Sequence, residues 1–352
     1  MKLIHCADIH LDSPMLTHMS AAQASMRNAQ IIDSFLRLTD YAAANGVRAV
    51  IIAGDLFDGE RVRGRTVDEI LAAMERTPEV DYLYLPGNHD GAARAFSDRT
   101  LPENLRQFGR EWTTFQYENV AVSGVQLCRE NGEAIYEAVP HAAGCVNIAV
   151  LHGQIGTVSG EDAVNLNLLK YKGIDYLALG HIHSYTLERL DDRGAYCYCG
   201  CLEGRGFDEC GDKGFVLLDV EDGKVTPAFV PFASRRLHRV PVDITGLTKS
   251  AQIAQAMKQA AQTISAEDMV EFLLTGSCEP EVDLSLIYLR ELMKSSFYFV
   301  KVKDETTCSL DPNQYKNDVS LKGAFIRLVL AGPEDDNDKA AMIRAGLQAL
   351  AG

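Results

Sequence analysis

Residues 47–58 read Val-Arg-Ala-Val-Ile-Ile-Ala-Gly-Asp-Leu-Phe-Asp, an apolar run that ends in a glycine and two carboxylates. An almost unbroken apolar run of this length is typical of a strand buried on both faces of a parallel sheet. A helical pattern over residues 21–44 precedes it and ends at Asn45-Gly46, where glycine tolerates the left-handed conformation that closes many helices. The stretch predicts an α/β fold with Asp55 at the carboxyl end of a strand, where the sites of such sheets collect.

Four other apolar runs end in the same way. These predicted strands cover residues 3–7, 82–85, 146–151 and 176–179. The polar side chains that follow the runs, together with Asp55, are Asp8, His10, Asn88, His152, His181 and His183. We expect these side chains to lie at one edge of the fold and to form a single site.

The mixture of carboxylate oxygen and imidazole nitrogen indicates the kind of site. Such a mixture suits manganese, iron or zinc, whereas an all-oxygen set would suit magnesium or calcium. The set is too large for one ion, and one shared carboxylate could bridge two. Two ions roughly 3.5–4 Å apart can clamp the attacking and leaving oxygens of a phosphoryl transfer. A bound water whose pKa falls towards ~7 supplies hydroxide at neutral pH.

Each motif also has an interpretation without a function. An Asp-x-His pair such as Asp8 and His10 is commonly a solvated surface pair, and Gly-His-x-His at residues 180–183 could be a pair of core histidines. Gly-Asn-His-Asp at residues 87–90 is more specific, because four polar or turn residues seldom follow a buried strand without a role. The five motifs together favour the metal site.

The cysteines pose a separate question. Cys197, Cys199 and Cys201 could hold zinc, or they could be small apolar residues of a strand over residues 195–199. Structural zinc sites usually use Cys-x-x-Cys pairs, so the alternating spacing favours the strand. The chain has nine cysteines, an odd number, which favours reduced thiols over a disulfide framework.

Composition limits the classes of protein that need to be considered. The 352 residues are 47% hydrophobic, enough for two domains, and no stretch approaches the roughly 18 apolar residues of a membrane span. The first residues lack the features of a signal peptide, so we expect a cytoplasmic protein that does not associate with membranes. The formal net charge of −15 argues against a broad basic face for nucleic acid, so any DNA contact must be local.

The pattern changes near residue 235. A hairpin over residues 214–230, turning at Asp222-Gly223, closes the first domain. We predict a catalytic domain over residues 1–235 and a small α+β domain over residues 236–352. In the second domain the predicted helices cover residues 249–264, 284–293, 322–330 and 339–350, and the predicted strands cover residues 269–275 and 297–302.

The series of motifs resembles the calcineurin-like metallophosphoesterases over roughly residues 1–232. That resemblance implies an α/β fold of two packed β-sheets flanked by helices. It implies one metal held by Asp8, His10, Asp55 and His183, and a second held by Asp55, Asn88, His152 and His181, with Asp55 as the bridge. It also implies that His89 donates a proton or stabilises charge beside the leaving oxygen, oriented by Asp90.

Two further stretches, residues 54–58 and 202–215, resemble the SbcD-type DNA repair exonucleases, including the YhaO-like branch. The resemblance implies a manganese-dependent DNA exo- or endonuclease, with iron or zinc as other candidate metals, that attacks the phosphodiester with metal-bound hydroxide. It implies a DNA-capping role for the second domain and a separate SbcC-type coiled-coil ATPase as partner. We expect a homodimer or a complex with the ATPase, in which the region after Arg239 takes part. The sequence departs from the relatives at Cys199-Gly200-Cys201, where many have Pro-Gly-Ser, so the substrate contacts of this loop are in doubt.

Two other functions remain open at this point. The metal site would equally serve a phosphoesterase acting on nucleotides or cyclic nucleotides, which the acidic charge favours. A scaffold that keeps metals only for stability is a third reading, although the presence of His89 argues against it. For a DNA substrate, the candidate contacts are Arg61, Arg63, Arg65 and Arg205.

Overall fold

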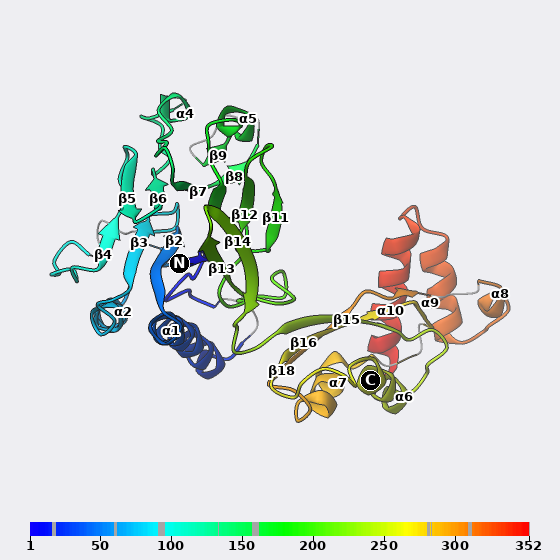
Figure 1. Cartoon of the computed structure of the whole chain (residues 1–352). Coiled ribbons are helices and arrows are strands. Elements are labelled where there is room, and N and C mark those ends of the chain that lie inside the picture. Colours follow the sequence, from blue (N-terminus) through cyan, green and yellow to red (C-terminus); the bar gives the residue numbers. More distant parts are fainter. Residues whose placement is uncertain are drawn as a thin grey trace. The chain divides into compact units, whose positions relative to one another are not determined.

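The structure is a computed structural model that describes the chain except for residues 16–18, 60–61, 91–95, 133, 157–161, 280–281, 283, 309–311 and 352. It divides into two units, Met1–Ser234 and Arg235–Gly352 (Figure 1). Within the described residues, no helix is both long enough and apolar enough to cross a membrane.

The first unit contains two six-stranded sheets. One has the strand order β14-β13-β1-β2-β3-β4, in which β1 to β4 run parallel, β13 is antiparallel to β1, and β14 is antiparallel to β13. In that order the strands are Lys224–Pro231, Gly214–Glu221, Lys2–Cys6, Val47–Ala53, Asp81–Leu85 and Leu105–Gln107. The expected strand over residues 47–53 and the expected hairpin are confirmed.

The second sheet has the order β11-β12-β10-β7-β6-β5. Its strands in that order are Thr186–Arg189, Ala195–Tyr198, Tyr176–Gly180, Val146–His152, Val120–Gly124 and Thr113–Tyr117. The four inner strands, β12, β10, β7 and β6, are parallel, and the outer strands β11 and β5 are antiparallel to their neighbours. A short pair, β8 (Gln154–Ile155) and β9 (Ala163–Val164), follows β7.

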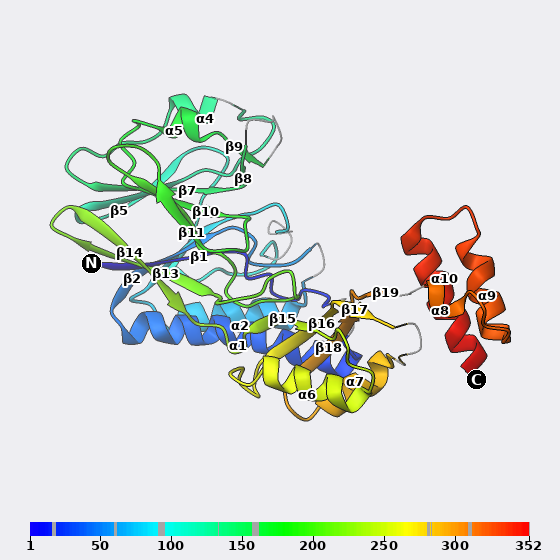
Figure 2. The same cartoon turned by 90° about the vertical axis from the view of Figure 1, so that its right-hand side faces the viewer.

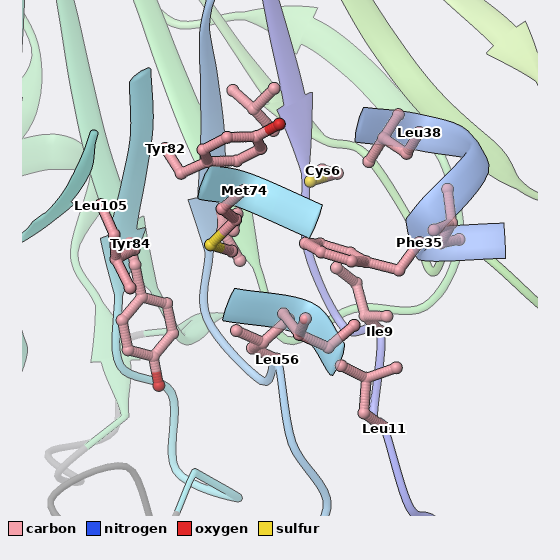
Figure 3. Close-up of a cluster of buried hydrophobic side chains, with 14 of the residues drawn as sticks. Cys6, Ile9, Leu11, Phe35, Leu38, Leu56, Met74, Tyr82, Tyr84 and Leu105 are labelled. Atoms are coloured by element: carbon pink, nitrogen blue, oxygen red, sulfur yellow. The ribbon is translucent and has the colours of Figure 1, made fainter. Parts of the chain in front are cut away.

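Side chains along the strands of the first sheet point alternately to its two faces, and each face carries its own hydrophobic core. Ile51 packs in the core shared with the second sheet, whereas Val50 and Ile52 pack on the opposite face. That face is covered by α1 (Ala21–Ala44) and α2 (Gly64–Glu75), and α1 lies along the strands (Figure 2). Figure 3 shows Phe35 of α1 beside Cys6 of β1 in this core, and Met74 of α2 on the side of Tyr82 and Tyr84 of β3. Short helices α4 (Ala134–Glu137) and α5 (Leu166–Leu169) cover the outer face of the second sheet. The predicted two-sheet α/β fold is confirmed.

The second unit is a small α+β structure. Parallel strands β15 (Leu237–Asp243), β16 (Met269–Thr275) and β18 (Phe299–Asp304) pack against α6 (Ser250–Ala260) and α7 (Leu286–Met293). The remaining elements are β17 (Ser277–Cys278), β19 (Thr307–Cys308), α8 (Pro312–Tyr315), α9 (Leu321–Leu330) and α10 (Asp336–Ala351). Residues of α8, α9 and α10 form a separate small core around Ile326.

Several elements differ from the sequence prediction. Helix α6 ends at Ala260, four residues before the predicted end, because the chain turns there and Ile264 N bonds back to Ala261 O. Strand β15 lies where no element was predicted, and its exposed Pro241 shows why an edge strand was not recognised. Strands β4, β5 and β6 were also missed, and of these β4 and β5 are partly exposed.

Candidate metal centre

The loops that follow β1, β2 and β10 are held in an unusual backbone conformation. Asp8, His10 and Asp55 have φ angles of 51°, 50° and 52°, and His181 has a φ of 96°. Residues other than glycine seldom adopt positive φ, and such strain gathers at functional sites. Here it is maintained because the loops pair with each other: Asp8 N donates to Gly54 O at 3.0 Å and His10 N donates to Asp55 O at 2.9 Å.

Three glycines allow the loops to approach one another. A Cβ at Gly180 would lie 1.9 Å from Ala53 O, and one at Gly54 would lie 2.0 Å from His152 Nδ1. A Cβ at Gly87 would lie 2.2 Å from an Asp55 oxygen. Because no real side-chain carbon tolerates such distances, the glycines in these motifs serve the packing of the site.

The first group of ligand atoms lies around His10. Asp8, His10 and His183 offer three ligand atoms within 4.8 Å of one another. His10 Nε2 lies 3.2 Å from His183 Nε2 and 3.7 Å from Asp55 Oδ2. Two imidazole nitrogens bound at roughly 2.0–2.1 Å to one tetrahedral ion would stand about this far apart, so the spacing fits a shared cation.

The second group lies on the other side of Asp55. His152 Nε2 is 3.4 Å from Asp55 Oδ2 and 2.9 Å from Asn88 Oδ1. His181 Nδ1 lies 3.2 Å from the same Asn88 oxygen. The Oδ2 atom of Asp55 therefore faces both groups, as a bridging ligand must. The structure brings all seven predicted ligands together. Asp8 also lies close to Asp55 and His152, so the division of the ligands between two ions stays a prediction.

Neighbouring groups fix the imidazole tautomers. His152 Nδ1 lies 2.8 Å from Ala53 O, and His183 Nδ1 lies 2.6 Å from the Oε1 atom of Glu209. A carbonyl and a carboxylate only accept hydrogen bonds, so each Nδ1 donates its hydrogen and each Nε2 turns a lone pair towards the centre. Metal-binding histidines are oriented in this way in proteins.

The charges of the centre favour a bound cation. Burial raises the pKa of Asp8 to about 6, because its carboxylate is removed from water. Burial would also raise the pKa of Asp55, but the hydrogen bond from His152 and the neighbouring imidazoles outweigh it and lower the value to about 2. The same partnership raises the pKa of His152 to about 9 against the effect of burial. Buried carboxylates that need a positive neighbour are suited to a divalent ion.

The structure corrects the expected partner of His89. The exposed His89 ring has its Nδ1 3.1 Å from Asp58 Oδ1. Asp90 instead accepts hydrogen bonds from the backbone of Phe57 at 2.7 Å and Gly87 at 2.9 Å. Asp90 therefore ties two loops together, and Asp58 orients His89. The sequence predicted no role for Asp58, although its place three residues after the candidate ligand Asp55 was a usable signal.

The four arginines predicted to contact substrate differ in their exposure and in their partners. Arg61 lies outside the described residues. Arg63 donates from its backbone N and its Nε to Asp12, each at 2.8 Å, and Arg65 is exposed on α2. Arg205 is mostly buried, with its guanidinium 3.4 Å from Asp58 and 3.1 Å from Glu209. The sequence also predicted no role for Glu209, which accepts a hydrogen bond from His183.

The cysteines belong to the sheet. Cys197 lies in β12 and packs with Cys199 in the core between the two sheets, which confirms the strand interpretation. Cys201 is also buried. Burial raises the pKa of Cys197 to about 11, so its thiol stays protonated. Within the described part of the chain, none of the residue groups able to hold a metal includes a cysteine.

Comparisons with known proteins show which families and proteins the chain is similar to. The model of the family described as "Calcineurin-like phosphoesterase" matches residues 1–185. "Uncharacterized metallophosphoesterase YhaO" of Bacillus subtilis is 27% identical over 263 residues, which cover 70% of this chain and 64% of that protein. The chain thus spans less than two thirds of that relative.

Two archaeal relatives align over more of the chain. "DNA double-strand break repair protein Mre11" of Methanopyrus kandleri is 27% identical over 353 residues, covering 88% of this chain and 74% of that protein. The protein of the same name from Saccharolobus solfataricus is 23% identical over 368 residues, covering 97% and 93%. Among solved structures, a dimetal phosphatase from Danio rerio aligns with a TM-score of 0.41 and 12% identity, over 66% of this chain and 99% of that one.

Proposed function

We propose that this chain, which belongs to the calcineurin-like phosphoesterase family, is a metal-dependent phosphoester hydrolase whose substrate is DNA. The observation that carries the chemistry is the convergence of two ligand groups on one Asp55 oxygen. The observation that favours DNA is the length of the alignment with the two archaeal double-strand break repair proteins. It covers 88% and 97% of this chain, whereas the family model ends at residue 185.

The donor set fits two divalent ions. Asp8, His10 and His183 would hold one, Asn88, His152 and His181 the other, and Asp55 would bridge them. We propose manganese, because carboxylate, amide and imidazole ligands together suit it, with iron or zinc as alternatives. When bound, such a pair of ions polarises a phosphate and lowers the pKa of a coordinated water.

His89 is proposed to act on the leaving oxygen. Its side chain is 51% exposed, so it can reach a substrate, while Asp58 at 3.1 Å holds its Nδ1. A carboxylate in this position fixes the orientation of the ring, as a proton donor beside the leaving oxygen requires. Asp90 contributes indirectly, by holding the backbone of the loops that carry Asp55 and His89.

Because the chain is acidic, we expect few contacts between its cationic side chains and the phosphates of DNA. Arg65 is exposed on α2, and Arg63 has a partner in Asp12 that phosphate would have to displace. Two bound ions would add positive charge at the point where a phosphate binds, so the formal charge of −15 overstates local repulsion. We therefore expect a weak dependence of DNA binding on salt.

The second unit is proposed to hold DNA or a partner. Its exposed apolar residues include Val319, Leu321 and Leu328, the last two of which lie on α9. A surface of this kind suits a protein partner, and a separate SbcC-type coiled-coil ATPase or a second copy of the chain are the proposed partners.

The test is an assay of the purified protein with Mn²⁺ on linear DNA, nucleoside monophosphates and cyclic nucleotides side by side. Cleavage of DNA with little turnover of the small substrates is expected. The alternative function, a phosphoesterase for nucleotides or cyclic nucleotides, is favoured by the net charge of −15. Fast nucleotide hydrolysis without DNA binding would establish that alternative and refute the nuclease.

A further inference from the structure

We propose that Arg205 is a positioning residue, which ties together two carboxylates behind the imidazoles of the metal centre, and that it does not contact substrate. The two carboxylates are Asp58 and Glu209. The inference rests on the proposed two-metal site but is independent of which phosphoester the enzyme cleaves.

The guanidinium of Arg205 lies between the two carboxylates. Its Nη1 is 3.4 Å from Asp58 Oδ2, and its Nη2 is 3.1 Å from Glu209 Oε1. The backbone N of Arg205 also donates to Glu209 Oε2 at 2.6 Å. Only 19% of the Arg205 side chain is exposed, against 14% for Asp58 and 7% for Glu209. The guanidinium therefore has little surface left for a ligand.

Each carboxylate reaches from Arg205 to an imidazole. Glu209 Oε1 accepts a hydrogen bond from His183 Nδ1 at 2.6 Å. Asp58 Oδ1 lies 3.1 Å from His89 Nδ1 and 3.6 Å from His10 Nδ1. The buried His10 Nδ1 atom has no hydrogen-bond partner in the described part of the chain, and Asp58 faces it at 3.6 Å. One cation thus holds the carboxylate that orients His183 and the carboxylate that faces both His89 and His10.

The local charge argues against a substrate contact. Two carboxylates surround one guanidinium, so the group carries no excess positive charge to offer a phosphate. An arginine suits the bridging role because its planar fork can bond two acceptors at once, whereas a lysine offers one compact charge. The loop itself is fixed two residues earlier, where the buried Glu203 binds the buried Arg27.

The experiment measures Mn²⁺ binding in the full-length protein by calorimetry, with metal content determined by elemental analysis. In Arg205→Met we expect one of the two ions to bind about 10–100-fold more weakly, as is usual when an outer-shell partner of a metal ligand is lost. Arg205→Lys should recover only part of the affinity. The control is Arg193→Ala, which removes an arginine that is paired with Asp175 outside the centre, and this variant should bind both ions as the wild type does.

Two further readouts separate positioning from other roles. The visible d–d bands of the Co²⁺-loaded protein should shift in Arg205→Met, because the imidazole geometry changes, while tryptophan fluorescence confirms that the variant is folded. Wild-type metal affinity and spectrum in Arg205→Met, combined with a raised KM for DNA, would overturn the proposal and assign a substrate contact. A wild-type protein that binds no Mn²⁺ would instead refute the proposed two-metal function.

Discussion

Removing the carboxylate of Glu203 should destabilise the first unit more than any other single change considered in this chain. Glu203 and Arg27 are fully buried and form an ion pair 2.5 Å long. Glu203 also accepts hydrogen bonds from Ser34 Oγ at 2.6 Å and from the backbone N of Ser234 at 2.5 Å. The pair joins α1 to the loop that carries Arg205, so its loss affects both the core and the metal centre.

The magnitude follows from burial. Glu203→Leu leaves Arg27 charged and buried with two neutral acceptors, Gly204 O at 2.8 Å and Gln30 Oε1 at 3.1 Å. Breaking a buried pair in this way costs about 3–5 kcal/mol. For a unit of this size that corresponds to a fall in Tm of roughly 6–20 °C, at about 2–4 °C per kcal/mol. Arg27→Met combined with Glu203→Leu removes both charges and should restore a large part of the loss, although Ser34 and Ser234 still lack their acceptor.

The assay is thermal unfolding followed by tryptophan fluorescence. Trp112 is the single tryptophan of the chain and lies in the first unit, where its Nε1 donates to Ile135 O at 2.8 Å. The signal therefore reports the first unit alone. Arg63→Ala is the matched control, because its pair with Asp12 involves a 61% exposed arginine and should contribute at most about 1 kcal/mol. A Tm of Glu203→Leu equal to that of the control would contradict the predicted loss of stability. A double variant no more stable than Glu203→Leu would show that the unpaired charge of Arg27 is not the cause of that loss.

Four other predictions test the centre. Asp55→Asn should lose bound Mn²⁺ and activity together, because its Oδ2 atom faces both ligand groups; retention of two ions by elemental analysis would exclude the bridge. His89→Gln should keep its metal while kcat falls about 10²–10⁴-fold, and loss of metal would make His89 a ligand. Gly54→Ala places a Cβ 2.0 Å from the His152 ring at a φ of +93°, so both Tm and Mn²⁺ affinity should fall, and a wild-type affinity would show that the loop can relax. Arg65→Ala should flatten the log–log salt dependence of DNA binding by about 0.7–0.9 if Arg65 contacts a phosphate, and an unchanged slope removes it from the interface.

The positions of the candidate ligands could be predicted from the sequence because their signal is local. A buried strand is an apolar run, and the residues just past its end are fixed in space by the sheet. Asp55 follows β2, His152 ends β7 and His181 follows β10, so three short patterns locate three candidate ligands before any contact is known. Parallel neighbours in each sheet then bring these ends to one edge.

The missed strands lacked such a signal. Strand β4 has three residues, two of them exposed, and β5 alternates between partly buried and exposed positions. Short strands at sheet edges gain their conformation from pairing with a neighbour, and that neighbour is not visible in the local pattern. The same holds for Arg205 and Asp58, which are 147 residues apart in the chain and meet only because β12 and β2 belong to sheets that pack together.

The error over Asp90 shows where adjacency in the chain misleads. Asp90 follows His89 directly, which suggested that it orients the ring. Consecutive side chains in a tight turn point in different directions, and here the buried Asp90 carboxylate gains more from the backbone N–H groups of Phe57 and Gly87 than from an exposed imidazole. Asp58, 31 residues earlier, reaches His89 because the two loops run side by side, with Gly59 N donating to His89 O at 3.0 Å. Ligands at strand ends follow from the sequence, whereas the groups that orient them depend on which loops the sheet makes neighbours.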